Sequence, residues 1–456
     1  MNGEIRRKYS LFEAICMVVG IVIGSGIFFK VPKVFLANDG GLLGALSSVG
    51  LVGIVVLTVA LSFSTLSEVY PVGDGLIGIA EVAIGPRFAY FLGWFTATVY
   101  YPTLTCALAR VSAGYIFSLL GITSIWGEPL LAVIILFAVF ALNTFFPTLT
   151  ARLGVSATII KLIPLLLLAI LGTAVGISGG GLAEHITGGG VSGFSLNSVT
   201  AGAVAFAFAY EGWIATASLS GEIKNPKKSL PVAIVGGLSI VLLVYLGYTL
   251  GIGGVLSSEE IISSGDSLAL SAFTSLFGSP TTGRLIYIFI LISCLGTTLG
   301  LSLAASRGML LLAERGWGPC PQRFYCPDEK TRAPIASSAV GLLISLVWLL
   351  QWEAGFVHRL LPPLLSFEPD ELPIITLYAA YIPLLLSLFL RGKRLGSFRR
   401  FVLPVLASLS ALFMLYAAIL SYKLEVIYYL IVFVLIMLIG LPFYRRRRGR
   451  LSESAN

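Results

Sequence analysis

The residues from Val18 to Pro32 form a membrane-length apolar run that is broken in its middle by Gly24, Ser25 and Gly26. In the hydrocarbon core of a membrane, every backbone N–H or C=O group that loses its helical partner costs several kcal/mol. A break is therefore tolerated where it lines a cavity or where a polar ligand binds it. The free N–H groups of Ser25, Gly26 and Ile27 would begin a new helix, and a helix N-terminus favours a carboxylate. Small residues also allow helices to pack closely, so this stretch alone leaves a binding role and a packing role open.

The composition identifies the chain as a membrane protein with many spans. Of its 456 residues, 57% are hydrophobic and 11% are charged, and the mean hydropathy is +0.95. A spanning helix needs about 20 mostly apolar residues. We therefore predict an all-α membrane protein with twelve transmembrane helices, at 11–31, 42–66, 87–118, 129–147, 154–176, 199–219, 231–255, 284–313, 335–352, 373–390, 401–421 and 426–444.

The basic residues indicate how the chain is oriented. The net charge is +8, and most of the 30 Lys and Arg residues fall in alternate loops and at the two ends. Because cytoplasmic loops of membrane proteins carry an excess of Lys and Arg, we place both termini in the cytoplasm, at the cell membrane. The basic tail then lies where it can contact anionic membrane lipids, and its charge gives no support for a nucleic-acid partner.

The sixth span, 199–219, is interrupted near its middle by Glu211 and Gly212. This span and the broken first span are five apart. Two broken helices in corresponding positions of five-helix halves point to an inverted-repeat transporter with its binding site at the breaks. Glu211 either handles the substrate or a proton, or it is a structural carboxyl that is neutral or paired with a neighbouring helix.

Two basic residues lie inside predicted spans. Arg110 is toward the outer end of the third span, and its side chain either reaches the outer headgroups or lines a vestibule. Lys161 lies about 10 Å into the fifth span from the cytoplasmic side, at 1.5 Å per residue. It either reaches back to the cytoplasmic surface or places a positive charge at the centre of the protein, where charged residues usually serve a function.

The cysteines and histidines do not favour a disulfide framework, a metal site or an enzyme. The five cysteines lie in spans or in the 314–334 loop, without an outward-facing pair, so we expect no structural disulfide. The two histidines, His185 and His358, fall in predicted outer loops, and the sequence has no metalloprotease or similar catalytic motif. We therefore predict no catalytic residues, no metal and no cofactor. The broken helices alone leave a channel as an alternative.

Four motifs lie between residues 24 and 319, and weaker echoes at 142–161 and 393–404 extend the pattern over nearly the whole chain. The four are Gly24–Phe28, Pro71–Trp94, Glu222–Pro231, and Ser306-Arg307 with Ala313–Pro319. In this order and spacing they resemble the motifs of the amino acid–polyamine–organocation (APC) superfamily of transporters, and the joint match is highly specific.

The resemblance implies the LeuT fold, with two inverted five-helix repeats and two peripheral helices. It divides the chain into a cytoplasmic N-terminus (1–10), two repeats (11–176 and 199–390), the peripheral helices (401–444) and the basic tail (445–456). It also implies a substrate site in which backbone N–H groups bind the carboxylate of an amino acid and backbone carbonyls bind its α-amino group. The N–H groups would be those of Ser25, Gly26 and Ile27, and the carbonyls those of Ile23, Phe208, Ala209 and Glu211.

Two side chains have further roles by this resemblance. Phe208 falls where the superfamily has an aromatic gate over the substrate. Lys161 falls where several members have a lysine in place of a sodium ion, which disfavours sodium coupling. The loop from Gly121 to Glu128 lacks the cysteine with which eukaryotic exchangers of one branch bind a glycoprotein, so we expect no disulfide-linked partner.

The sequence thus predicts a secondary active transporter of L-amino acids that works by alternating access. The leading hypothesis is proton symport, with Lys161 or Glu211 carrying the proton. The alternative is obligate exchange of amino acids with Lys161 permanently charged. Which side chains are accepted, and whether Arg110 takes part, stay open.

Overall fold

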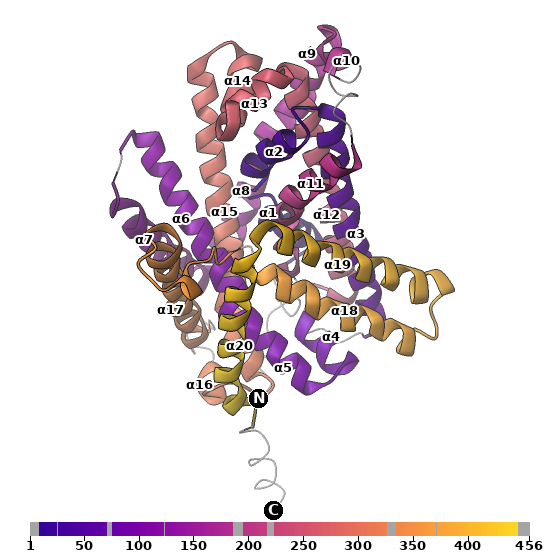
Figure 1. Cartoon of the computed structure of the whole chain (residues 1–456). Coiled ribbons are helices and arrows are strands. Elements are labelled where there is room, and N and C mark those ends of the chain that lie inside the picture. The colour runs from indigo at the N-terminus through magenta and orange to yellow at the C-terminus, as the bar shows by residue number, and fades with distance from the viewer. Residues whose placement is uncertain are drawn as a thin grey trace, which may run out of the picture.

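The computed structural model describes residues 9–24, 26–70, 75–122, 124–185, 195–216, 223–325, 334–370 and 372–445, and these are almost entirely helical (Figure 1). Some of the predicted features lie outside the described residues. They are Ser25, parts of two motifs at 71–74 and 217–222, and the tail beyond Arg445.

Ten helices in the described part of the chain are long and apolar enough to cross a membrane. An eleventh span is formed if the bent pair α1 (Leu11–Val22) and α2 (Gly26–Ala37) counts as one. The described residues therefore support ten or eleven of the twelve predicted spans. The ten are Leu42–Val69, Pro86–Leu120, Gly127–Phe145, Pro147–Ser178, Lys228–Val255, Leu285–Ala313, Ile335–Val357, Pro373–Arg391, Phe398–Tyr422 and Leu424–Tyr444.

The first span is broken between α1 and α2, whose axes differ by 50°. The start of α1 is fixed by a capping box. The hydroxyl of Ser10 accepts the backbone N–H of Glu13, and the Glu13 carboxylate accepts the backbone N–H of Ser10 at 2.6 Å. The break itself falls at the glycines, where the chain leaves the helical path.

The region of the sixth span contains a short α-helix, α11 (Leu196–Phe206), followed by the 3₁₀ turn η4 (Ala207–Tyr210). A turn at Glu211 and Gly212 comes next, and Gly212 has φ +94°. This left-handed conformation favours glycine because a Cβ is strained there. Within the described residues α11 alone is too short to span a membrane, which is why the twelfth span is missing from the count.

The centre of the bundle is built from helices of both halves of the chain (Figure 1). The most extensive helix contacts join α3 (Leu42–Val69) to α12 (Pro226–Val255), and α6 (Tyr101–Leu120) to α15 (Pro280–Ala313). The first helix, α1, packs against α12, α15 and α8 (Pro147–Leu167). These contacts place the break between α1 and α2 among helices from both halves.

Close glycine contacts bring α12 against the end of the fifth span, formed by η2 (Leu168–Gly172) and α9 (Thr173–Ser178). A Cβ added to Gly172 would lie 2.6 Å from the carbonyl oxygen of Gly251. One added to Gly176 would lie 2.5 Å from the Cα of Gly254. The two backbones therefore touch, as small residues in membrane helices permit.

The remaining elements surround this centre. The third span contains a π-helical turn, η1 (Thr96–Tyr100), between α5 (Pro86–Phe95) and α6. The hairpin of α18 (Pro373–Arg391) and α19 (Leu403–Tyr422) packs on α3, and α20 (Leu424–Arg445) lies against α5. The other helices are α4 (Gly75–Ala83), α7 (Gly127–Phe145), α10 (Gly181–Glu184), α13 (Ser258–Ser264), α14 (Leu268–Phe277), α16 (Pro321–Tyr325) and α17 (Ile335–Gln351), the last continuing into η7 (Trp352–Val357).

Candidate functional site

The two helix breaks lie directly against each other. A Cβ added to Gly26, at the start of α2, would lie 3.5 Å from the Cα of Ala209 in η4. A Cβ added to Gly212 would lie 2.7 Å from Cγ2 of Ile21 near the end of α1. The unpaired backbone groups of both breaks are therefore brought to one place, although they are separated by almost two hundred residues in the sequence.

Tyr245 of α12 joins the two breaks through its hydroxyl. The hydroxyl oxygen lies 3.2 Å from the carbonyl oxygen of Val22 in α1 and 3.0 Å from that of Ala209 in η4. The ring is buried and makes edge-to-face contacts with Phe206 and Tyr210, at centroid distances of 5.5 and 5.0 Å. The aromatic contacts hold the ring, and the hydroxyl supplies a donor to carbonyls of the two unwound segments.

Lys161 of α8 also binds the end of α1. Its side chain is 1% exposed. The ammonium nitrogen donates to the carbonyl oxygens of Gly20 at 2.5 Å and Ile23 at 2.6 Å, and to Oγ1 of Thr297 at 3.1 Å. An ammonium group has three hydrogens, so each of them has an acceptor. The side chain therefore points into the centre of the protein and does not reach back to a surface.

Two hydroxyl side chains of α15 complete this cluster. Thr297 also donates to the Gly20 carbonyl at 2.9 Å, and Ser293 donates to the Ile23 carbonyl at 3.2 Å. A carbonyl oxygen has two lone pairs. In this conformation the Ile23 carbonyl, one of those predicted to hold a substrate amine, thus already has donors from Lys161 and Ser293, and the Ala209 carbonyl has a donor from Tyr245.

Glu211 faces the third and tenth spans rather than Lys161. Its Oε2 atom accepts the hydroxyl of Tyr100 at 3.1 Å, and Tyr378 of α18 lies beside the same carboxyl group. The π-turn η1 contains Tyr100, and π-turns in helices occur frequently at functional sites. The Oε1 atom has no hydrogen-bond partner among the described residues, although the side chain is only 8% exposed.

The remaining predicted site residues are placed only in part. Gly26 begins α2, and Ile27 follows it as a fully buried residue. Ser25 lies outside the described residues, and so does the side chain of Phe208, the predicted gate, whose backbone belongs to η4. The predicted carboxylate site is thus described at two of its three N–H groups.

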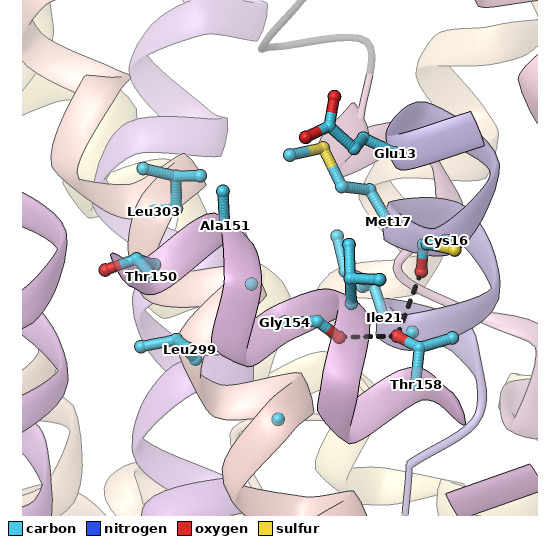
Figure 2. Close-up of a pocket in the computed structure, with 14 residues that line it drawn as sticks. Glu13, Cys16, Met17, Ile21, Thr150, Ala151, Gly154, Thr158, Leu299 and Leu303 are labelled. Carbon is cyan, nitrogen blue, oxygen red and sulfur yellow. Dashed lines mark hydrogen bonds between the residues drawn. The ribbon is translucent and has the colours of Figure 1, made fainter. Parts of the chain in front are cut away.

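A pocket that is partly open to solvent runs along α1 from its start to Gly20, next to the Lys161 cluster (Figure 2). It lies between α1, the first half of α8 and the second half of α15. Glu13 lines it near the start of α1, and Gly20 lines it near the other end. Gly20 also belongs to the Lys161 cluster, because its carbonyl accepts a hydrogen bond from Lys161. Figure 2 shows Thr158 on its wall, with the hydroxyl bonded to the carbonyls of Cys16 at 3.2 Å and Gly154 at 2.8 Å.

Arg110 is held by carboxylates and does not extend freely to headgroups. Its Nη1 atom lies 2.5 Å from Oε2 of Glu128 at the start of α7, and its Nε atom lies 2.5 Å from Oε1 of Glu353 in η7. Nε2 of His358 is 3.7 Å from the other oxygen of Glu353, and its ring lies tilted against that of Trp126, with ring centroids 5.9 Å apart. This ion cluster joins the third, fourth and ninth spans at a distance from the breaks.

Sequence reasoning missed the hydroxyl side chains around the breaks. Tyr100, Tyr245, Ser293 and Thr297 donate to the carbonyls or the carboxylate described above. Their signal was a polar hydroxyl in the middle of an apolar span, which has to find a partner in the absence of water.

Comparison with known proteins identifies relatives over most of the chain. A family model described as "Amino acid permease" matches residues 9–453. The serine/threonine exchanger SteT of Bacillus subtilis is 30% identical over 418 residues, which cover 89% of this chain and 87% of SteT. The human cystine/glutamate transporter is 25% identical over 69% of this chain and 63% of its own. The mouse b(0,+)-type amino acid transporter 1 is 26% identical over 69% of this chain and 64% of its own.

Proposed function

The chain belongs to the amino acid permease family of the APC superfamily, and from this premise we propose that it is an obligate exchanger of L-amino acids. It is a multi-pass membrane transporter and not an enzyme. SteT and the chain align over nearly their full lengths, and SteT is named an exchanger. This similarity favours exchange over the proton symport that the sequence first suggested.

The single observation that carries the proposal is the environment of Lys161. All three ammonium hydrogens have acceptors, and two of these acceptors are carbonyls at the end of α1. A positive charge fixed here satisfies the carbonyls that unwinding leaves without partners. Exchange needs no other ion to move with the substrate. A lysine that keeps its charge through the whole transport cycle is therefore compatible with exchange, because it has no proton to release.

The binding site lies at the two breaks, with the carboxylate of the amino acid on the N–H groups at the start of α2. The contact between Gly26 and Ala209 supports this placement because it brings both unwound segments together. The family implies the LeuT fold with twelve spans, α11 and the residues after η4 forming the sixth. Serine and threonine are the first substrates to test, since they are what SteT is named for.

The cavity of Figure 2 is the inner access path to this site. With the N-terminus in the cytoplasm, the start of α1 lies on the cytoplasmic side, and so does the end of the cavity that Glu13 lines. The arrangement then corresponds to an inward-facing state of alternating access.

Transport by the purified protein in liposomes tests the proposal. A panel of labelled amino acids, beginning with serine and threonine, is offered to vesicles that are empty or preloaded with unlabelled amino acid, with and without an inward proton gradient. We expect uptake only into preloaded vesicles, at a rate that the gradient does not change. Uptake into empty vesicles that rises with the gradient would replace exchange by symport, and no uptake of any amino acid would overturn both.

Proton symport remains the second candidate because of Glu211. Its carboxyl is buried beside neutral hydroxyls, one of its oxygens has no hydrogen-bond partner among the described residues, and no described cation is paired with it. A carboxyl in this setting can carry a proton between two states of the protein. The same liposome assay separates the two candidates.

A further inference from the structure

The tip of the hairpin between α18 and α19 is a cluster of cations. The stretch from Arg391 to Arg400 contains five Lys and Arg residues and no acidic residue. The tip lies at the edge of the molecule, away from the centre of the bundle (Figure 1). Lys393 and Arg394 are exposed there, and no described carboxylate forms an ion pair with either of them. These two cations therefore carry charge that the described part of the protein does not neutralise.

A third cation of the tip, Arg400, is held in a fixed position. Its Nε and Nη2 atoms donate to the carbonyl oxygen of Phe389, at 3.1 and 2.8 Å, and its guanidinium carbon lies 4.7 Å from the centre of the Phe401 ring. A guanidinium has five N–H hydrogens, and the contacts with described residues use two of them. The others suit a phosphate group, because guanidinium groups bind phosphate through paired hydrogen bonds.

The three cations belong to one surface. A Cβ added to Gly392 would lie 3.5 Å from Cγ of Arg400, so the backbone just before Lys393 lies against the Arg400 side chain. The tip is also joined to the end of α3. Arg399 forms an ion pair with Glu68, and the guanidinium carbon of Arg391 lies 5.9 Å from the centre of the Tyr70 ring. The cationic surface is therefore supported by the bundle.

Exposed apolar side chains lie directly beside these cations. Phe398 is 59% exposed and Phe401 is 45% exposed, and both belong to the π-helical turn η9 (Phe398–Val402), which leads into α19. The exposed apolar surface continues along α19 through Val405 and Leu409, which are one turn apart. Surfaces that combine apolar area with Lys and Arg in this way bind anionic membrane lipids.

We propose that the tip of the α18–α19 hairpin is a binding site for an anionic phospholipid. Its phosphate lies on Arg400, Lys393 and Arg394, and its acyl chains lie along the exposed face of α19. The apolar face distinguishes this site from one for free phosphate. Binding of the lipid does not rest on the proposed amino acid exchange, whereas its placement in the cytoplasmic leaflet rests on the predicted orientation.

The first test measures lipid binding to the purified full-length protein in a nonionic detergent. The probe is dioctanoyl phosphatidylglycerol, and it is compared with dioctanoyl phosphatidylcholine, which has no net charge, and with glycerol 3-phosphate, which has no acyl chains. We expect saturable binding of phosphatidylglycerol that is at least tenfold tighter than binding of either comparison compound. Equal binding of glycerol 3-phosphate would show an anion site and overturn the lipid site, as would equal binding of phosphatidylcholine.

Replacing Lys393 and Arg394 with Gln locates the site. Both side chains are exposed, so the variant should fold, and we expect phosphatidylglycerol to bind about fivefold more weakly for each cation removed. The matched control is Arg87→Gln with Arg152→Gln, which removes the same charge at two exposed positions elsewhere and should leave the affinity unchanged. Unchanged affinity in Lys393→Gln with Arg394→Gln, or an equal decrease in the control, would overturn the site at the tip.

The second test measures thermal unfolding. A ligand that binds only the folded protein raises its unfolding temperature. Phosphatidylglycerol should therefore raise the unfolding temperature of the parent, and the increase should be smaller when Lys393, Arg394 and Arg400 are all replaced with Gln. An equal increase in both proteins would place the lipid elsewhere and overturn the proposal. Neither test measures transport, so a failure of the proposed exchange would leave these results unaffected.

Discussion

The ammonium nitrogen of Lys161 lies 2.6 Å from the carbonyl oxygen of Ile23, the residue that caps the first half of the broken first helix. This contact joins the fifth span to the break that the proposed substrate would occupy. It is therefore the contact whose loss we expect to affect transport most strongly.

Replacing Lys161 with Ala should abolish amino acid exchange in liposomes. The change removes the charged donor of the Gly20 and Ile23 carbonyls, which keep only the hydroxyl donors of Thr297 and Ser293. A hydrogen bond from a charged group contributes about 1.5–3 kcal/mol. Thr297→Val, which removes one acceptor of Lys161, should lower exchange less. Thr298→Val is the control, since among the described residues the Thr298 hydroxyl bonds to the Cys294 carbonyl of its own helix, at 2.7 Å, and to no other group. Normal exchange by Lys161→Ala would contradict the fixed-charge role.

Replacing Glu211 with Gln should leave exchange independent of pH if the carboxyl has no part in coupling. The variant keeps the hydrogen-bonding shape beside Tyr100 but cannot carry a proton. Uptake is measured with and without an inward proton gradient in both proteins. A gradient-driven uptake by the parent that disappears in Glu211→Gln would instead establish Glu211 as the proton carrier.

Replacing Gly212 with Ala should strongly impair exchange. The residue has φ +94°, and its new Cβ would lie 2.7 Å from Cγ2 of Ile21, so both backbone strain and a clash act at the contact between the breaks. The strain alone amounts to about 1–3 kcal/mol. Gly236→Ala is the control, because no atom lies within 4 Å of a Cβ at this position in α12. Equal activity of the two variants would contradict the tight packing of the breaks.

Replacing Arg110 with Met should lower the unfolding temperature of the purified protein without changing substrate specificity. Glu128 and Glu353 would lose their shared cation, at about 1–3 kcal/mol. Adding Glu128→Gln and Glu353→Gln should recover part of the loss, since the unpaired charges are then gone. Arg152→Met, at an exposed position, is the control and should have little effect. A change in specificity would place Arg110 in the substrate path.

Filling the cavity should block transport from the inside. Gly154 lines the cavity, and no atom lies within 4 Å of a Cβ there, so Gly154→Ala should be tolerated. Gly154→Phe projects a ring into the same space and should reduce exchange to a small fraction of the parent rate. Equal rates for Ala and Phe would show that substrates do not pass through this cavity.

The spans and their interruptions could be predicted from the sequence, because each depends on residues that are close together in the chain. Apolar runs of membrane length predicted the spans, and Gly24, Gly26 and Gly212 predicted the interruptions, because a break in a span requires unusual residues. The span count was less secure, since a broken span such as the sixth consists of short pieces that do not meet the length criterion separately.

The hydrogen-bond and ion-pair partners of the buried polar side chains could not be predicted from the sequence. Arg110 and Glu353 are 243 residues apart, and Tyr245 and Val22 are 223 apart. Which polar side chains meet depends on the rotation of each helix, and the π-turn η1, which ends at Tyr100, changes that rotation within the third span. The hydropathy of the sequence predicts where a span lies, but it does not predict which face of the helix each residue occupies.

The crossing at Gly172, Gly176, Gly251 and Gly254 has a consequence for the ionic gradients of the cell. A membrane transporter dissipates these gradients if ions leak beside it. Where two backbones touch, as they do between α9 and α12, there is no room for a column of water. We therefore expect this contact to prevent ion leakage between the two helices, and a larger side chain at any of these glycines to push them apart and open a measurable conductance.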